Sequence, residues 1–162
     1  MSVTSLLSRL KVRFRKFSRP RFFKVDEDSD VILPTRGTAG SAGYDFFMAH
    51  DIIINPKQTV AIQTGVYVHM PEDMTLILAL RSSMMTKISF AYNISIIDSD
   101  AYINPASMKR GVTLMLTNIG DKKIHIEKGS RVVQGVFVKY YTTVDDKPAR
   151  KSRTGLFGST GK

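Results

Sequence analysis

The sequence predicts an all-β domain, a distorted jelly roll or β-sandwich with at most one short helix. From residue 21 onward, short runs of β-branched and aromatic residues recur, and almost no segment has the 3.6-residue apolar periodicity of a helix. Turn-forming pairs such as Asn55-Pro56, Thr64-Gly65 and Met70-Pro71 separate these runs. Many short strands at regular spacing are typical of sandwiches and jelly rolls.

The strands can be located from these runs. One helical turn or short helix is expected after Arg81-Ser82-Ser83, because serine is a good first residue for a helix. The predicted strands are Ile52–Ile54, Thr59–Ile62, Val66–Val68, Thr75–Leu78, Val112–Leu116 and a long one from Arg131 through Tyr141.

Composition limits the classes of function. The chain has 162 residues and 43% hydrophobic content, which suits one globular domain with a real core. It has no cysteine, which excludes disulfides, zinc–thiolate sites and cysteine nucleophiles. The three histidines are far apart and lack the spacing of zinc ligands. No apolar run reaches the ~20 residues of a spanning helix, and we expect a cytoplasmic protein.

The positive charge is concentrated at the N-terminus. The net charge is +10, but residues 1–24 hold eight of the 24 basic residues and no acid, which leaves 16 basic against 14 acidic residues in the rest. This distribution separates a basic arm (1–20) from a β domain (21–144). The polar segment that follows (145–162) is assigned as a C-terminal lid and is expected to be mobile when nothing is bound.

The basic arm has three open interpretations. Leu6, Leu10, Phe14 and Phe17 have helix-compatible spacing, whereas residues 11–15 alternate like a strand. The arm is either disordered or lightly docked, or a surface for membrane or nucleic acid, or an organelle transit segment rich in arginine and free of acids. The sequence does not decide among them.

The first two polar segments combine a carboxylate with an anion-binding turn. Asp45 follows Ser41-Ala42-Gly43-Tyr44 at the start of a predicted strand. Arg81-Ser82-Ser83 brings a guanidinium, two hydroxyls and backbone N–H groups to the predicted helix start, where unpaired amides attract anions. Taken alone, this second segment is better explained by an ordinary serine-capped turn with a surface arginine.

The third and fourth segments place polar side chains on apolar strands. Asp98 closes the run Ile96-Ile97, and if that strand is buried, low-dielectric surroundings would hold Asp98 as a positioned base. A polar strand end before a turn is the simpler alternative. Gln134 interrupts an apolar strand, and a buried glutamine without a hydrogen bond costs about 1–3 kcal/mol. Gln134 therefore needs a partner in the protein or in a ligand.

The fifth segment is the tail Arg153-Thr154-Gly155-Leu156-Phe157-Gly158-Ser159-Thr160-Gly161. It combines a cation, an aromatic ring, glycines and hydroxyls, which suits closure over a phosphorylated base. A flexible charged C-terminus without a role is the default alternative.

Together, and in this order, the five segments resemble the five motifs of the trimeric dUTPase family. The resemblance runs from about Ile32 to the C-terminus, and the order is specific although each motif is weak alone. Residues 33–45 and 132–140 are most similar to the bacteriophage-type branch. Members of that branch carry extra residues after the third motif, and Ile103–Arg110 are the corresponding extra residues in this sequence.

The resemblance implies a homotrimer that hydrolyses dUTP to dUMP and pyrophosphate at sites between subunits. Asp98 would direct the attacking water to the α-phosphorus, and Asp45 would support a metal–water network or a neighbouring arginine. Mg²⁺ would be held mainly by the triphosphate, without direct protein ligands. The residues implied to bind phosphate are Arg81, Ser82, Ser83, Gln134, Arg153, Ser159 and Thr160. Those implied to contact base and sugar are Asn93, Ser95, Ile96, Ile97, Tyr102, Phe157 and Gly158, with Phe157 over the uracil ring.

Four positions depart from the family's pattern. Ala101 stands where the family has an aromatic ring against the deoxyribose, and Tyr102 would substitute for it after a one-residue shift. Ser95 replaces a glycine, Tyr92 an asparagine, and Leu156 a glycine of the lid. Because the catalytic and phosphate-binding residues are retained, we expect an active enzyme with weaker sugar discrimination or lower affinity.

Other functions compete with this one. The related dCTP deaminases share the fold and the Arg-Ser-Ser motif, but their catalytic glutamate aligns with Met115, which cannot transfer a proton. A catalytically weak or inactive dUTPase-fold protein that acts as a regulatory binding partner is the main alternative. Residues 101–110 would be its surface for a protein partner, which an active enzyme could also use. Contact of residues 1–24 with nucleic acid is independent of both interpretations.

Overall fold

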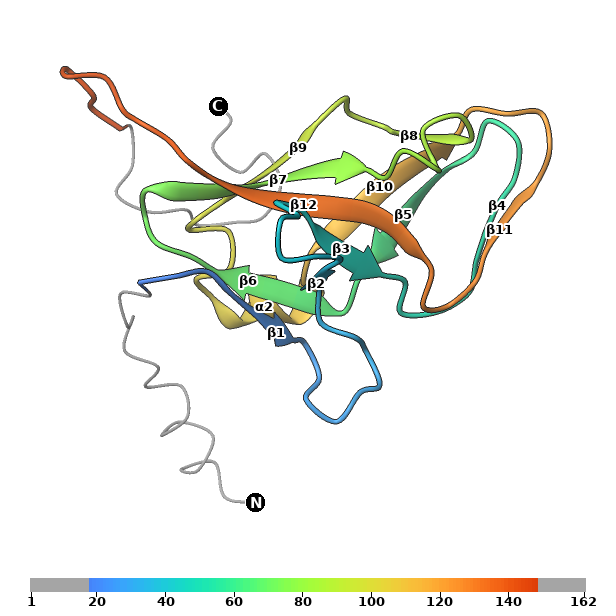
Figure 1. The fold of residues 1–162 in the computed structure, drawn as a ribbon, viewed down its shortest axis with the longest axis horizontal. Helices are drawn as coiled ribbons and strands as arrows, with labels where there is room; N and C mark the ends of the chain where they lie inside the picture. The colour runs from blue at the N-terminus through green and yellow to red at the C-terminus, as the bar shows by residue number, and fades with distance from the viewer. Residues whose placement is uncertain (1–17, 149–162) are drawn as a thin grey trace.

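The structure is a computed structural model that describes residues 18–148, and it has the predicted all-β architecture (Figure 1). The described part contains one helix, α2 (Pro105–Arg110). The strands in chain order are β1 (Arg21–Lys24), β2 (Thr35–Arg36), β3 (Tyr44–Phe47), β4 (Ile52–Ile54), β5 (Thr59–Gln63), β6 (Val66–His69), β7 (Met74–Leu80), β8 (Ile88–Phe90), β9 (Ser95–Asp98), β10 (Thr113–Asn118), β11 (Ile124–Ile126) and β12 (Arg131–Lys139).

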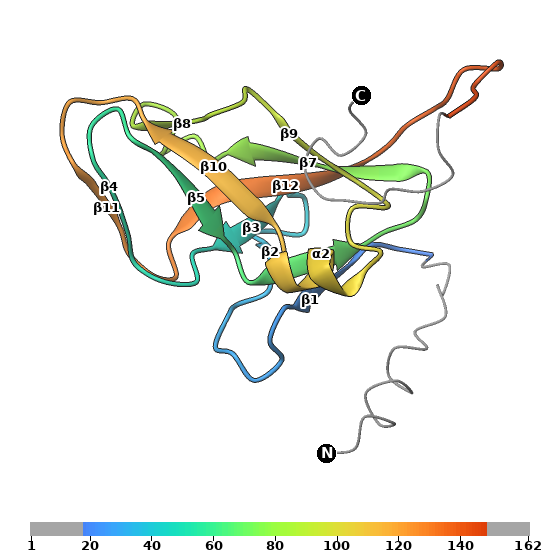
Figure 2. The same ribbon diagram turned by 180° about the vertical axis from the view of Figure 1, so that it is seen from behind.

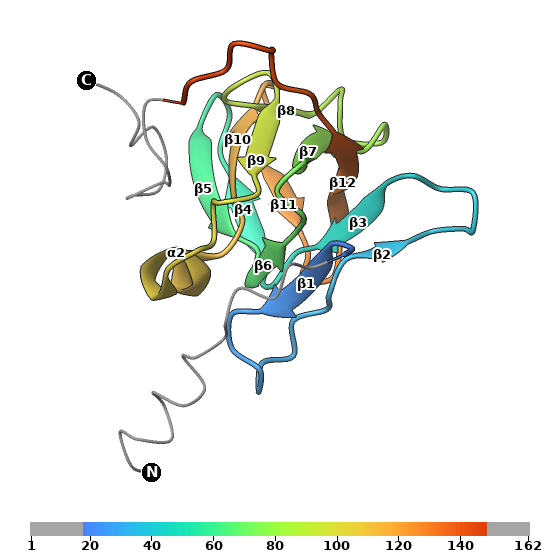
Figure 3. The same cartoon turned by 90° about the vertical axis from the view of Figure 1, so that its left-hand side faces the viewer.

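Two sheets enclose the core. The larger has the strand order β2-β3-β12-β7-β9, and the smaller has the order β5-β10-β8. Figure 3 shows β5 and β10 on one side of the domain and β7 and β12 on the other. Two ribbons, β1–β6 and β4–β11, complete the fold. All of the pairs are antiparallel, as a jelly roll or sandwich requires.

Strict alternation along β7 separates the inside of the larger sheet from its outside. Leu76, Leu78 and Leu80 point into the core, while Ile77 and Ala79 lie on the opposite face. Leu76 and Leu78 are fully buried, together with Phe46 of β3 and Leu114 and Leu116 of β10. The outer face of the larger sheet is therefore a separate surface, and the polar residues of interest lie there.

A β-bulge in β12 controls which of its residues reach this outer face. Val132 and Val133 are consecutive, yet both are buried, and the pairing register with β3 shifts between Arg131 and Val133. A bulge inserts one extra residue and re-aims the side chains beside it. Arg131 and Gln134, which plain alternation would place on opposite faces, consequently share the outer face.

The predicted strands are confirmed, but the helix is at another place in the chain. Residues 82–87 form consecutive turns, and the Ile88 N–H donates to the Met84 carbonyl at 3.0 Å, so the expected helical turn after Arg81 is present but does not extend into a helix. The physical reason is length, because Ile88 already pairs with Asn118 as β8 begins and leaves no room for a run of helical hydrogen bonds. Within residues 18–148, no helix has the length and apolar character that a membrane crossing requires.

Helix α2 is instead formed by the extra residues after the third motif. Asn104 caps it by accepting a hydrogen bond from the Ser107 N–H at 2.9 Å, and Pro105 occupies the first turn. The helix lies beside β6 in Figure 2. Gly111, with φ of 63°, ends it where a Cβ atom would lie 2.7 Å from the Val66 carbonyl oxygen.

Gly135 provides a test of the packing between the sheets. A Cβ atom there would lie 2.8 Å from Leu76 Cδ1 and 3.0 Å from Phe46 Cε2, inside the core. We expect Gly135→Ala to lower the free energy of unfolding by about 1–3 kcal/mol, because overpacking strains a closely packed core. Urea unfolding followed by circular dichroism measures this. Gly40→Ala, where a Cβ atom would meet nothing within 4 Å, is the matched control. Equal unfolding midpoints for the two variants would contradict the described packing.

Candidate active site

A buried carboxylate between two arginines forms the centre of the site. Asp45 is only 7% exposed and lies on the outer face of β3, because its neighbour Phe46 occupies the core. Arg81 Nε donates to Asp45 Oδ1 at 3.2 Å, and an Arg131 Nη atom donates to Oδ2 at 3.2 Å. Two guanidinium groups face one carboxylate, so this cluster has a net positive charge and suits an anion.

Gln134 lies in the same region of the outer face. It pairs with Asp45 on one side and with Ala79 on the other. A Cβ atom at Gly43 would lie 2.6 Å from Gln134 Oε1, so only a glycine at position 43 leaves room for the Gln134 side-chain amide as it lies here. The first and fourth motifs thus meet across the β3–β12 pair.

The Arg81-Ser82-Ser83 segment continues directly from β7. The Arg81 N–H donates to the Val132 carbonyl at 2.9 Å, which keeps Arg81 in register beside β12. The turns that follow use the N–H groups of Met84 and Lys87, which donate to Arg81 O and Met84 O. Ser82 and Ser83 are exposed. The segment therefore presents hydroxyls next to the arginine pair, although without the helix dipole that the sequence suggested.

Asp98 lies at the opposite end of the larger sheet. It pairs with Thr75, six residues before Arg81 along the same strand direction, and at ~3.3 Å per residue this places the two backbones about 20 Å apart. Asp98 is exposed, because β9 is an edge strand and Asp98 shares its outer face with Ile96. The condition under which we expected low-dielectric surroundings for Asp98, a buried strand, is therefore not met at its side chain within a single chain.

The predicted base- and sugar-binding side chains divide between core and surface. Asn93 is exposed and Ile96 is 58% exposed, but Ser95 and Ile97 face the core at 7% and 8%. The side chains of Ser95 and Ile97 are therefore turned away from the outer face that carries Ile96. Sequence reasoning could not assign these faces, because the run from Ile94 to Ile97 contains three isoleucines and shows no alternation.

Tyr102 requires a correction. Its ring is 6% exposed, lies in the core cluster and has its centroid 6.3 Å from that of Tyr67. Burial, together with the nearby Tyr92, raises the pKa of the Tyr102 hydroxyl above its ordinary value. Tyr102 therefore does not substitute for the sugar-binding ring. Ala101 occupies that position at the end of a turn, where its N–H donates to the Asp98 carbonyl at 3.1 Å.

Other predicted residues lie outside the described part of the chain. These are Arg153, Leu156, Phe157, Gly158, Ser159 and Thr160 of the fifth motif and residues 1–17 of the basic arm. The segment 101–110 is described, and α2 forms most of it. Ser107 and Met108 pack inward, and its exposed residues are Pro105, Ala106, Lys109 and Arg110.

Sequence reasoning missed Arg131, because plain alternation from Gln134 would turn position 131 toward the core. The consecutive apolar pair Val132-Val133 is the only signal of the bulge that brings Arg131 outward. Within residues 18–148, no group of three or more histidine or acidic side chains could hold a metal ion.

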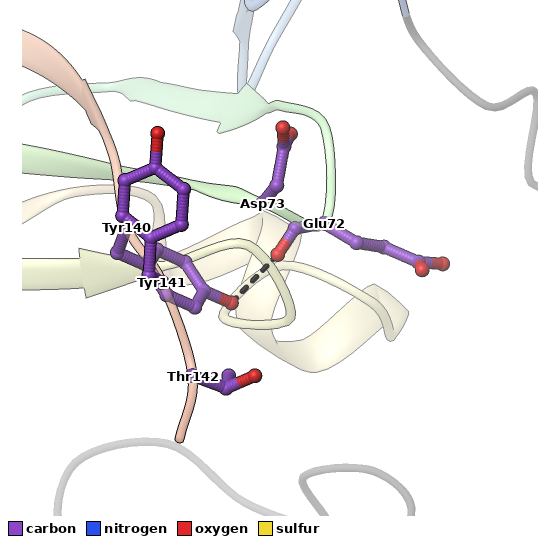
Figure 4. Close-up of a pocket in the computed structure, with 5 residues that line it drawn as sticks. All are labelled: Glu72, Asp73, Tyr140, Tyr141 and Thr142. Carbon is purple, nitrogen blue, oxygen red and sulfur yellow. Dashed lines mark hydrogen bonds between the residues drawn. The ribbon is translucent and has the colours of Figure 1, made fainter. Parts of the chain in front are cut away.

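A shallow pocket of about 390 Å³ lies near the turn that follows Asp98 rather than near the arginines. Glu72, Asp73 and residues 140–142 line it (Figure 4). The Tyr140 hydroxyl donates to the Glu72 carbonyl at 2.6 Å, and the Ser99 hydroxyl donates to the same oxygen at 3.5 Å. The pocket thus lies where the chain leaves β12, next to the turn that follows Asp98.

Comparison with known proteins defines the class. The profile of the dUTPase family matches residues 29–161, and the chain belongs to this family. It is 34% identical over 138 residues to the deoxyuridine 5'-triphosphate nucleotidohydrolase of Lactococcus lactis, which covers 83% of this chain and 91% of that protein.

Solved structures agree. The dUTPase of Streptococcus mutans matches with a TM-score of 0.69 and 32% identity over 75% of this chain and 97% of that chain. The dUTPase of Staphylococcus bacteriophage 80alpha has the same fold, with a TM-score of 0.64 at 21% identity over 81% of this chain and 96% of that chain. The sequence-based assignment of family and fold is confirmed.

The burial of Tyr102 can be tested by pH. Ionisation of Tyr102 is disfavoured in the folded state, so the unfolded chain releases this proton first as the pH rises above ~10. The stability that the neutral ring provides is complete below pH 10 and is lost above it, by up to about 1.4 kcal/mol per pH unit.

We expect Tyr102→Phe to lose less unfolding free energy than the wild type between pH 10 and pH 11, measured by urea unfolding. Tyr141→Phe, at a tyrosine that is 97% exposed, is the matched control. An unchanged pH dependence in Tyr102→Phe would mean that Tyr102 is accessible to solvent.

Proposed function

We propose that the protein hydrolyses dUTP to dUMP and pyrophosphate. The observation that carries this proposal is the cluster of Asp45, Arg81 and Gln134 on one face of the larger sheet. Three of the family's motifs converge there and form a positively charged anion site with the hydroxyls of Ser82 and Ser83 beside it. Such a site suits the phosphates of a nucleotide and holds charge that develops on a leaving pyrophosphate.

In the proposed reaction, Asp98 accepts a proton from a water molecule as the water oxygen bonds to the α-phosphorus. The bond from that phosphorus to the oxygen that bridges the α- and β-phosphates breaks, and pyrophosphate leaves with the bonding pair. Arg81, Ser82, Ser83 and Gln134 bind the phosphates and stabilise the negative charge on the leaving group.

The separation of Asp98 from Arg81 supports a site built between subunits. A base must come within ~3 Å of the water that it activates, and a backbone separation of about 20 Å within one chain argues against Asp98 serving the arginines of its own subunit. Val136, Ile77 and Ile96 form a cross-strand apolar row on the outer face between the two groups. A second copy that covers this row would bring its own Asp98 to the first copy's arginines, as in the homotrimer that the family resemblance implies.

The C-terminal tail is proposed to complete the site as a lid. Figure 1 shows the segment after β12 running away from the body of the domain, and Tyr141 and Val144 are almost fully exposed. The bond from Tyr140 to Glu72 holds the start of this segment. The fifth motif, with Arg153 and Phe157, would then reach a neighbouring subunit's nucleotide.

Mg²⁺ is proposed to arrive with the triphosphate. Both oxygens of Asp45 already accept from arginines, and the residues of the described range form no carboxylate cage. This arrangement suits an ion bound by phosphate oxygens, which neutralises part of their charge. Asp45 then fits the arginine-holding role, the second of the two that the sequence left open.

A mixed-subunit experiment tests both the reaction and its geometry. Asp98→Asn removes the base and Arg81→Ala removes a phosphate ligand, and we expect each variant alone to lose at least ~100-fold in kcat for dUTP. After joint refolding of equal amounts, random trimers should recover roughly a quarter of the wild-type activity, because each mixed trimer regains one intact site.

Pyrophosphate release from dUTP is the measurement, and separately refolded variants mixed afterwards are the control. No recovery in the jointly refolded sample would place the whole site within one chain. No release by the wild type would refute dUTP hydrolysis itself.

Weakened sugar discrimination follows from the buried Tyr102. With Ala101 at the sugar position and the neighbouring ring in the core, no aromatic side chain from this turn remains to exclude a 2′-hydroxyl. We propose that the enzyme accepts UTP more readily than family members with a ring at this position do.

The corresponding prediction is that Ala101→Tyr raises the ratio of kcat/KM for dUTP to kcat/KM for UTP by about 10-fold or more, because a packed ring penalises the extra hydroxyl. Steady-state assays with both nucleotides measure this. Ala106→Tyr on the exposed side of α2 is the control and should leave the ratio unchanged. If Ala101→Tyr leaves the ratio of the two kcat/KM values at its wild-type level, a group other than the side chain at position 101 sets the discrimination against ribose.

A further inference from the structure

We propose that His69 is a positioning residue for the turn that follows Asp98: it holds the backbone of Tyr102 and thereby fixes the direction of the proposed base. This inference rests on the proposed dUTP hydrolysis and adds to it a residue that acts through another side chain. It concerns a region away from the arginines, where β6 and the N-terminal strand β1 form a two-stranded ribbon (Figure 3).

The His69 ring is packed against two aromatic rings. Val66 and Val68 of β6 are buried, so alternation places Tyr67 and His69 together on the opposite face of the strand. The His69 ring centroid lies 5.4 Å from that of Phe23 in β1 and 5.5 Å from that of Tyr67. Phe23 and Tyr67 are themselves stacked, with their centroids 5.2 Å apart. An imidazole against two rings that also pack on each other has little freedom to rotate.

A hydrogen bond joins the His69 ring to the backbone of Tyr102. Burial lowers the pKa of the His69 imidazole, and this backbone hydrogen bond opposes the shift. A bond that favours the protonated ring has the ring as its donor, so the Tyr102 carbonyl is the acceptor. Because its pKa is lowered, the imidazole is neutral at pH 7 and donates from the one nitrogen that carries a proton. The bond therefore requires one tautomer and one ring orientation.

The turn is short enough to transmit this contact to Asp98. The Ala101 N–H donates to the Asp98 carbonyl at 3.1 Å, which closes the turn one residue before Tyr102. On the strand side, Asp98 pairs with Thr75, whose hydroxyl donates to the carbonyl of the residue before Asp98 at 2.9 Å. The backbone around Asp98 is thus supported by β7 before it and by β6 after it.

The side chain of Tyr102 adds a second attachment to β6. Its ring is 6% exposed and lies 6.3 Å from that of Tyr67, two residues before His69. Main chain and side chain of Tyr102 are therefore both held by β6. Asp98 itself is exposed at a strand end, so the direction of its side chain depends on this backbone. A misplacement of ~1 Å in a reacting group can lower a rate by about 100-fold.

Part of this support comes from outside the segment that the family profile covers. The profile matches residues 29–161, whereas Phe23 lies in β1, before that segment. The Arg21 guanidinium lies over the Phe23 ring, 5.2 Å from its centroid, and adds a cation–π contact to the stack. The N-terminal strand therefore contributes to the geometry of the proposed catalytic turn.

The experiment replaces the imidazole with a side chain that keeps the hydrogen bond and with one that removes it. His69→Gln retains a neutral N–H donor, whereas His69→Leu retains an apolar side chain without a donor. His50→Leu is the matched control, because His50 is exposed in a bend. Steady-state hydrolysis of dUTP gives kcat and KM, and urea unfolding and size-exclusion chromatography show whether each variant is folded and assembled.

We expect His69→Leu to lower kcat by about 10-fold or more while KM changes less than about threefold, because misdirection of the base affects the chemical step rather than nucleotide binding. His69→Gln should restore kcat to within about threefold of the wild type, because its amide can donate to the same carbonyl. His50→Leu should match the wild type. An equal loss in His69→Gln and His69→Leu, or a loss confined to KM, would overturn the proposal.

A measurement on the wild type covers the case in which His69→Leu does not fold. The chain has three histidines, so isotopic labelling of histidine nitrogen gives an NMR spectrum of only three rings. We expect the His69 signals, assigned by their loss in His69→Gln, to be those of a single neutral tautomer at pH 7. A rapidly exchanging mixture of both tautomers would refute the proposal.

Failure of this inference is distinguishable from failure of the proposed function. No pyrophosphate release by the wild type would refute dUTP hydrolysis itself. An active wild type with an equally active His69→Leu would refute only the role of His69.

Discussion

The ion pairs of Asp45 are the interaction on which the site depends. They join β3, β12 and the end of β7, three neighbouring strands, through one nearly buried carboxylate. A carboxylate in this position is tolerated only because both of its oxygens are paired, and each arginine is in turn held in one orientation by it. The packing of Val132 and Val133 in the core and the anion site on the outer face thus depend on the same bulged segment of β12.

The geometry of the larger sheet explains why a single chain is incomplete. Antiparallel pairing fixes Asp98 beside Thr75 at one end of β7, while Arg81 leaves the other end. No rearrangement of side chains removes a separation set by the strand register. An edge strand with the exposed Ile96 next to Asp98 offers a surface that a neighbouring copy would cover, so subunit assembly and catalysis are coupled in the proposed enzyme.

The segment after Asp98 is the structural basis of the proposed change in sugar specificity. Tyr102 fills space in the core beside Tyr67, and Asn104 then starts α2. A ring that contributes to the core is not available to a ligand, because withdrawing it would leave a cavity that costs several kcal/mol. The departure of this chain from its family at Ala101 therefore has a structural basis in the direction of the next side chain.

The fold class, the family and most of the strands could be predicted from the amino-acid sequence, because alternation, turn residues and the order of five motifs are all local in the chain. Asp45, Arg81, Gln134 and Asp98 were predicted as site residues in the same way. Which of these residues meet depends on the folded arrangement of the strands. The β12 bulge brought Arg131 to the outer face, and the core took Tyr102 away from the site. These outcomes depend on strand register and on competition for buried volume between residues distant in sequence, which no local pattern records.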